Sequence, residues 1–216
     1  MKRDEQVSRN KEQSRQKLID AVGSIILRDG FGSIGINSVA KEANLDKVLI
    51  YRYFDGLDGL LREFARRKDF YINISDLILE EIKNAREEDL TELVIKILVS
   101  QLRGLRENSV LQELMLWEML ERNELTIAIA KDREAKGYEL SRRLKEKMNL
   151  AGDESDAAIA LLVSGIYYLV LRSRTVDVYN GVDISAEEGW LQIEKAIRQI
   201  VTSYFSSLTQ NSTDKK

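Results

Sequence analysis

The chain has 216 residues, of which 32% are charged and 44% are hydrophobic, and its formal net charge at pH 7 is −3. It contains no His and no Cys, which excludes disulfides, thiolate zinc sites, cysteine nucleophiles and Ser-His-Asp catalysis. A carboxylate- or lysine-based enzyme is the remaining catalytic alternative, but the sequence offers no paired motif for one. We therefore expect a protein that is not an enzyme, with no catalytic residue, metal site or cofactor.

The chain also has no proline, which favours long, uninterrupted helices. Residues 1–68 are net positive and the remainder is net negative, so the N-terminal third is expected to meet a polyanion. The charged segment Met1–Lys17 does not resemble a signal peptide, and a cytoplasmic protein is expected. The apolar run Ala157–Leu171 is shorter than a membrane span and is interpreted as a helix buried in a bundle.

Four short elements are predicted in the first 68 residues. Apolar side chains at helical spacing predict a helix from about Asn10 to Arg28. A second helix is expected over about Ile36–Ala43 and a third over about Lys47–Phe54. Asp46 is the expected N-cap of the third helix, because its carboxylate can accept bonds from free backbone amides. A fourth helix is expected to begin near Leu57.

The rest of the chain reads as longer helices. They are expected over residues 74–86, 90–107, 109–122, 125–148, 154–174 and 186–208. Strand-like alternation is absent, so no strand is predicted. The sequence therefore predicts an all-α fold with about nine or ten helices.

The second and third helices have the dimensions of a helix-turn-helix. Ile50 and Phe54 are four residues apart, so they share a face that is expected to pack on the first two helices. The remaining surface of the third helix carries Lys47, Val48, Leu49, Tyr51, Arg52 and Tyr53. A DNA major groove is wide enough to admit such a helix. The alternative is that Val48, Leu49 and Tyr51 are core residues and that the charges only solvate a surface.

The chemistry of these side chains suits DNA. Lys and Arg can neutralise phosphates or donate to guanine edges, and apolar side chains can contact thymine methyl groups. Tyrosines offer a hydroxyl and a ring to the backbone, and an Asn in the second helix can bond a phosphate or a base edge. The predicted DNA-binding residues are Asn37, Lys47, Val48, Leu49, Tyr51, Arg52 and Tyr53.

Several short motifs follow one another at fixed spacing. They are Gly30-Phe31, Val39-Ala40, Ala43-Asn44-Leu45-Asp46, Ile50-Tyr51-Arg52-Tyr53-Phe54 and Leu60-Leu61. Through them, residues 10–68 resemble the DNA-binding domain of the TetR family of repressors. The chain departs from the family pattern at Gly35, where a capping Ser or Thr is usual, and at Val48-Leu49, where a Gly-Thr pair is usual. It departs again at Leu57, where a phosphate-binding Lys is common.

The resemblance implies a sequence-specific transcriptional regulator, expected to be a repressor that a small-molecule effector releases from a palindromic operator. The implied divisions are 1–56 for the N-terminal arm and helix-turn-helix, 57–72 for a connecting helix, 73–208 for a helical effector-binding and dimerisation domain, and 209–216 for a polar tail. The alternative is a helical small-molecule-binding protein that has lost operator binding, because Gly35 and Leu57 replace usual phosphate-side residues.

A homodimer is expected through the helices at about 154–174 and 186–208, since two such helices from each subunit can form a four-helix interface. The alternative is that both helices are only intramolecular core. A two-fold dimer would present two recognition helices about 34–36 Å apart to a palindrome.

The effector is expected to be apolar or aromatic. Candidate pocket residues are the aromatic and methionine side chains of the middle helices, which line adaptable apolar pockets but also fill ordinary cores. They are Phe70, Tyr71, Met115, Trp117, Met119, Tyr138 and Tyr167. Glu118 and Glu121 are expected on a solvated face opposite Leu114, Trp117 and Leu120. The alternative is that they point inward and pair with a cationic ligand.

Overall fold

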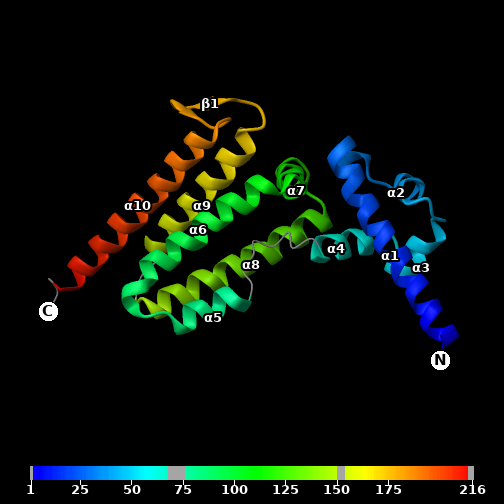
Figure 1. The fold of residues 1–216 in the computed structure, drawn as a ribbon, viewed down its shortest axis with the longest axis horizontal. Helices are drawn as coiled ribbons and strands as arrows, with labels where there is room; N and C mark the ends of the chain where they lie inside the picture. The colour runs from blue at the N-terminus through cyan, green and yellow to red at the C-terminus, as the bar shows by residue number, and fades with distance from the viewer. Residues whose placement is uncertain (1, 68–75, 150–153, 214–216) are drawn as a thin grey trace. The chain divides into compact units, whose positions relative to one another are not determined.

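The computed structural model describes residues 2–67, 76–149 and 154–213. The described residues form ten α-helices, two short 3-10 helices and one small hairpin (Figure 1). The elements are α1 (Lys2–Asp29), η1 (Phe31–Ser33), α2 (Ile36–Glu42), α3 (Val48–Phe54), α4 (Leu57–Arg67), α5 (Asp76–Asn84), η2 (Glu87–Asp89), α6 (Leu90–Glu107), α7 (Ser109–Leu120), α8 (Glu124–Lys147), α9 (Glu154–Arg172), β1 (Val178–Tyr179), β2 (Val182–Asp183) and α10 (Glu187–Thr213). The predicted all-α class is confirmed.

The chain divides into two compact units. Unit 1 comprises residues 1–72 and 109–135, and unit 2 comprises residues 73–108 and 136–216. The sequence-based division had placed residues 109–135 with the larger C-terminal domain. In the structure this segment packs with the N-terminal helices, because α7 contacts α1 and η1. The contact with η1 includes the stacked rings of Phe31 and Trp117, whose centroids are 4.3 Å apart.

The core of unit 1 follows the predicted helical spacing. On α1 the buried apolar residues are Leu18, Ile19, Ala21, Val22, Ile25 and Ile26. Helix α1 packs against α2 and α4, where Val39 and Phe64 are fully or almost fully buried, and Ile50 of α3 is fully buried too. Helix α1 begins at Lys2, well before the expected start at Asn10. Residues 2–10 contain no Gly or Pro and several good helix formers, so the helix continues through this polar segment.

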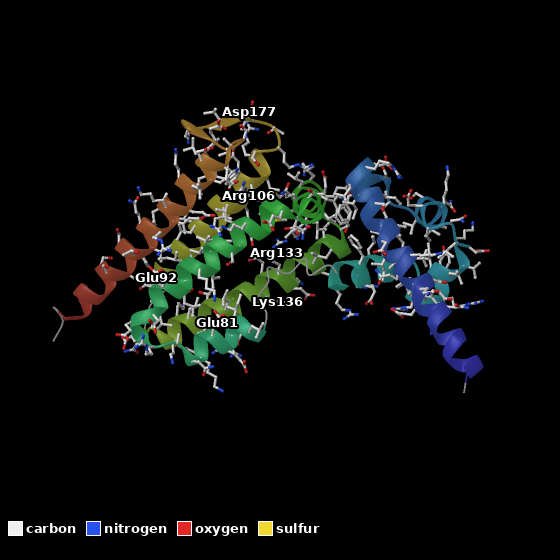
Figure 2. All side chains as sticks on the ribbon, in the orientation of Figure 1. Glu81, Glu92, Arg106, Arg133, Lys136 and Asp177 are labelled. Atoms are coloured by element: carbon white, nitrogen blue, oxygen red, sulfur yellow. The ribbon has the colours of Figure 1, made fainter. Side chains whose placement is uncertain are left out.

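Unit 2 is built around α6, which packs against both α9 and α10 (Figure 1). Apolar side chains on most sides of α6 are buried, among them Leu90, Val94, Ile95, Leu98 and Leu102. Ion pairs join the outer faces of α6 and α10. They are Arg103–Glu194 at 2.6 Å, Arg106–Glu187 at 2.6 Å and Arg198–Glu92 at 2.6 Å. The guanidinium of Arg106, labelled in Figure 2, also lies 4.5 Å from the ring centre of Trp190.

The expectation that the chain has no strand was wrong. Val178–Tyr179 and Val182–Asp183 pair antiparallel across Asn180 and Gly181. Both turn residues have positive φ, 49° and 84°, which is the backbone that a tight Asn-Gly hairpin requires. Each strand has only two residues, too few for alternation along the sequence to reveal.

Helix α9 is less covered than its apolar sequence suggested. Its window Ser155–Arg172 is, among the described residues, the one helical segment long and apolar enough to cross a membrane by length and composition alone. Only 22% of that window is buried within the chain, whereas burial on nearly all sides had been expected. Close to the start of the window, the carboxylate of Asp156 pairs with Lys145 of α8 at 2.6 Å. One face of α9 is therefore open in the single chain.

Candidate nucleic-acid interface

The turn between α2 and α3 depends on a left-handed residue at Asn44, whose φ is 51°. The amide of Asn44 donates to the carbonyl of Lys41 at 3.1 Å, and the amide of Leu45 donates to the carbonyl of Ala40 at 3.0 Å. This pair of bonds closes a helix C-terminus in the Schellman pattern. Asn is one of the few residues other than Gly that adopt this backbone readily, so the turn forms although Gly is absent.

Side-chain caps fix the starts of both helices. The carboxylate of Asp46 accepts a hydrogen bond from the amide of Val48 at 2.8 Å. It thus bonds a free amide as expected, although Lys47 and not Asp46 occupies the N-cap position of α3. At the start of α2, Gly35 has no side chain to cap the helix. The hydroxyl of Ser38 instead accepts from the amide of Gly35 at 2.8 Å and donates to the carbonyl of Ser33 at 2.9 Å. Ser38 thus forms the reciprocal half of a capping box, but it does not replace the acceptor that a Ser or Thr at position 35 would offer to the first amides of α2.

Helix α3 has the predicted buried and exposed faces. Ile50 and Phe54 are 0% and 8% exposed, whereas Val48 and Tyr51 are 53% and 55% exposed. This difference excludes the alternative in which Val48 and Tyr51 are core residues. Two large side chains, one apolar and one aromatic, therefore stand in solvent on a seven-residue helix.

The other predicted contact residues lie on the same short elements. Asn37, Lys47 and Arg52 are exposed, and Leu49 and Tyr53 are half-buried. The ring of Tyr53 packs edge-on against Phe54 with centroids 6.4 Å apart. The structure thus keeps all seven predicted residues out of the fully buried core, and their contact with DNA stays a prediction.

Lys41 is a further candidate that the sequence analysis missed. It lies one helical turn after Asn37 on α2 and is exposed. Residues four apart share a helix face, so helical spacing alone could have identified it. Within the described part of the chain, Lys41, Lys47 and Arg52 make no ion pair with a carboxylate. The positive charge of these side chains is therefore available to an anionic partner.

The predicted pocket residues lie in both units. Phe70 and Tyr71 fall outside the described residues. In unit 1, Met115 is 2% exposed, Trp117 stacks on Phe31 and Met119 is 66% exposed. In unit 2, Tyr138 is 67% exposed, and the hydroxyl of Tyr167 accepts a hydrogen bond from Gln101 at 2.7 Å. Their role in binding an effector stays a prediction.

Glu118 corrects one expectation about α7. It had been placed on a solvated face, but its side chain is only 10% exposed and pairs with Arg133 of α8, itself 8% exposed. Leu120 had been placed on the opposite, covered face and is 84% exposed. Helical spacing gave little guidance here, because apolar side chains lie all around α7.

Comparison with models of known protein families found no match. Two curated relatives are uncharacterised HTH-type transcriptional regulators of Mycobacterium tuberculosis, from strains CDC 1551 / Oshkosh and H37Rv. Each is 26% identical over 110 residues, which cover 48% of this chain and 50% of the relative. The chain therefore matches about half the length of these relatives.

Among solved structures, the chain is similar to the fatty acid degradation regulator FadR from Bacillus halodurans. The TM-score is 0.62 at 17% sequence identity, and the overlap covers 87% of this chain and 94% of FadR. A TetR-family transcriptional regulator from Haemophilus influenzae overlaps with a TM-score of 0.36 at 20% identity, covering 71% of this chain and 97% of that one.

The chain thus shares its helical fold with FadR and has a helix-turn-helix near its N-terminus. The curated relatives of its sequence are helix-turn-helix regulators, and these findings are consistent with the TetR family whose motif the N-terminal segment resembles.

Proposed function

We propose that this chain is a sequence-specific DNA-binding transcriptional regulator of the cytoplasm, a homodimeric repressor that a small-molecule effector releases from a palindromic operator. The observation that carries the proposal is the exposed face of α3, where Val48 and Tyr51 stand in solvent beside Lys47 and Arg52. These exposed side chains do not contribute to the packed core of the chain. Its cations can bind phosphates or guanine edges, its tyrosine hydroxyl can bind the DNA backbone, and its apolar side chains can contact thymine methyl groups.

The exposed face of α9 supports dimerisation. Ala157, Ala160, Leu161, Ser164 and Tyr168 recur at helical spacing and are all exposed, with Leu161 at 76% and Tyr168 at 50%. None of them carries a charge. Large apolar side chains in water are unfavourable at roughly 25 cal/mol per Å² of exposed apolar area. A second subunit would remove this cost.

Helix α10 has a similar uncharged face. Its exposed members are Gln192, Ala196, Gln199, Ile200 and Ser203, and Ile200 is 51% exposed. Trp190, Ile197 and Val201 point the other way and are buried in unit 2. The alternative that both helices serve only as intramolecular core accounts for those three residues but not for the exposed face. We infer that α9 and α10 pair with the same helices of a second copy.

Effector binding is proposed for the helical region beyond the helix-turn-helix, with an apolar or aromatic molecule as the ligand. Tyr167 and Gln101 support this assignment, because their hydrogen bond places a polar pair between α6 and α9, where apolar side chains predominate. An effector that binds the other conformation of the dimer more tightly than the operator-binding one would shift the dimer away from the operator.

The DNA proposal is tested with the full-length chain and fragments of the genome that encodes it. Fragments retained by the protein are titrated in a gel-shift assay at about 50 and 200 mM salt. The affinity for DNA should fall by orders of magnitude from the lower to the higher salt concentration, because several phosphate contacts release counterions. Tyr51→Ala should weaken binding at unchanged helicity. Val178→Ala should not, because Val178 is similarly exposed, at 58%, but lies on the β1–β2 hairpin and has no proposed role. Absent or salt-insensitive binding would instead favour a small-molecule-binding protein that has lost operator binding.

Dimerisation is tested separately by sedimentation. Leu161→Glu places a charge on the open face of α9 and should convert a dimer into a monomer at micromolar concentration. Leu77→Glu is the matched control, because Leu77 of α5 is also highly exposed, at 70%, but lies outside the proposed interface. A wild-type chain that sediments as a monomer would contradict the proposed dimer.

A further inference from the structure

Arg15 of α1 lies against the C-terminal end of α3. Its Nη1 donates a hydrogen bond to the carbonyl oxygen of Tyr53 at 2.7 Å. Its guanidinium also lies 4.6 Å from the ring centre of Phe54. The last carbonyls of a helix lack partners within the helix and carry its partial negative charge. An arginine at this place both satisfies a carbonyl and matches the helix dipole.

The same guanidinium reaches a third helix. Its Nη2 lies 3.7 Å from Oε1 of Glu63 on α4, and its Nε lies 3.7 Å from Oε2 of Glu12 on α1. The side chains of Arg15 and Glu63 are only 22% and 16% exposed. Salt therefore screens this pair less than it screens a pair on the open surface. Arg15 connects α1, α3 and α4 at a single point.

Each of these contacts uses a different part of the guanidinium. Nη1 donates to Tyr53, Nη2 approaches Glu63, and the central carbon lies over the ring of Phe54. A lysine has one compact ammonium group and no planar face, so it cannot make the three contacts together. The arrangement requires arginine specifically.

We propose that Arg15 is a positioning residue for DNA recognition: it fixes the rotation of α3 at which Val48 and Tyr51 face the groove. The inference rests on the proposed function. Arg15 itself is directed at the backbone and ring of α3, so it acts through the helix and contributes no contact to DNA. Losing it should reduce the preference for one DNA sequence more than the attraction to DNA in general.

The test compares Arg15→Met and Arg15→Lys with Lys17→Met in the full-length chain. Lys17 is an exposed cation on the same helix, so its replacement removes the same charge without touching α3. For each variant, affinity is measured for a fragment that the wild type prefers and for an unrelated duplex of equal length. The ratio of the two affinities does not depend on the folded fraction of the sample.

Arg15→Met should lower that ratio about tenfold or more, since hydrogen bonds to charged groups are among the stronger contacts in proteins. Affinity for the unrelated duplex and the salt slope should stay unchanged. Arg15→Lys should lower the ratio by an intermediate factor, and Lys17→Met should leave it unchanged. An unchanged ratio in Arg15→Met would overturn the proposal. A weaker salt dependence of DNA affinity in Arg15→Met, with an unchanged ratio of the two affinities, would also overturn it. Arg15 would then be a phosphate contact.

A second readout requires no DNA and separates this proposal from the proposed function. Amide hydrogen exchange over residues 48–55 in the free chain should be faster in Arg15→Met than in Lys17→Met, because α3 is no longer anchored at its end. Unchanged exchange would overturn the positioning role even for a protein that prefers no DNA sequence. If exchange is faster in Arg15→Met but the wild type prefers no DNA sequence, DNA recognition is rejected. The anchoring of α3 by Arg15 is then still supported.

Discussion

Phe31 and Trp117 stack face to face, with ring centroids 4.3 Å apart and ring planes inclined by 4°. The first ring belongs to the short 3-10 helix before α2 and the second to α7, 86 positions later in the sequence numbering. The stack therefore attaches the segment preceding the helix-turn-helix to α7 within unit 1.

A double-mutant cycle measures that attachment. Phe31→Leu and Trp117→Leu should each destabilise the chain, and the double variant should lose less than the sum of the two. The expected coupling is about 0.5–1.5 kcal/mol, the usual value for an aromatic pair beyond its buried area. Urea unfolding followed by circular dichroism provides the free energies. Strict additivity would mean that the two rings contribute independently.

Gly59 allows α4 to approach α3 unusually closely. A Cβ at this position would lie 1.7 Å from the carbonyl oxygen of Phe54, a separation that requires the backbone to move. Gly59→Ala should therefore destabilise the chain by about 1–3 kcal/mol and weaken DNA binding. Gly104→Ala on α6 is the control, because nothing lies within 4 Å of its Cβ position. That change should stabilise α6 by up to about 1 kcal/mol.

The buried ion pair between Glu118 and Arg133 should be sensitive to the loss of one partner. Arg133→Met leaves a carboxylate that is 10% exposed without its partner, and should cost about 3–5 kcal/mol. Replacing both residues, as Glu118→Leu with Arg133→Met, should recover much of that loss. Thermal and urea unfolding check both values. Arg142→Met, which breaks an exposed pair with Glu139, should have little effect.

Asp183 should make the stability of unit 2 depend on pH. The Ser185 hydroxyl and the amides of Ser185 and Ala186 donate to its carboxylate and lower its pKa. A carboxyl whose pKa is lower in the folded state stabilises that state above its unfolded pKa of about 3.9. This contribution disappears as the pH falls through the folded-state pKa.

The corresponding experiment follows melting temperature between about pH 7 and pH 2.5 for the wild type and Asp183→Asn. The wild type should melt at a higher temperature near neutral pH, and the difference should shrink in acid. A difference that stays constant over this range would show that the charge of Asp183 is not involved.

Much of unit 1 could be predicted from sequence because its signals are local. The spacing of Ile50 and Phe54 predicted the buried face of α3, and the carboxylate of Asp46 bonds a free amide at its start as expected. Non-local contacts gave no such signal. The anchoring of α3 by Arg15 joins residues 38 positions apart, and Phe31 meets Trp117 only through the tertiary fold.

The misplacement of Glu118 and Leu120 has a different cause. Helix α7 is apolar on several sides, so its phase depends on which neighbours cover it. The open face of α9 escaped prediction for a related reason. An apolar sequence such as Ala157–Leu171 indicates that a helix is buried against other elements. It does not indicate whether those elements belong to the same chain or to a second one.

The left-handed backbone of Asn44 bears on how this sequence can diverge. The turn between α2 and α3 requires a left-handed conformation rather than a particular side chain, so Asn44 serves at a helix end where Gly is the most common residue. At the start of α2, the Ser38 hydroxyl accepts from the amide of Gly35 and so keeps one half of a capping box. At both positions the residue differs from the more common one, but the backbone conformation or hydrogen bond that the fold needs is kept. The sequence of such a protein can therefore lose detectable similarity to its relatives while its fold stays the same.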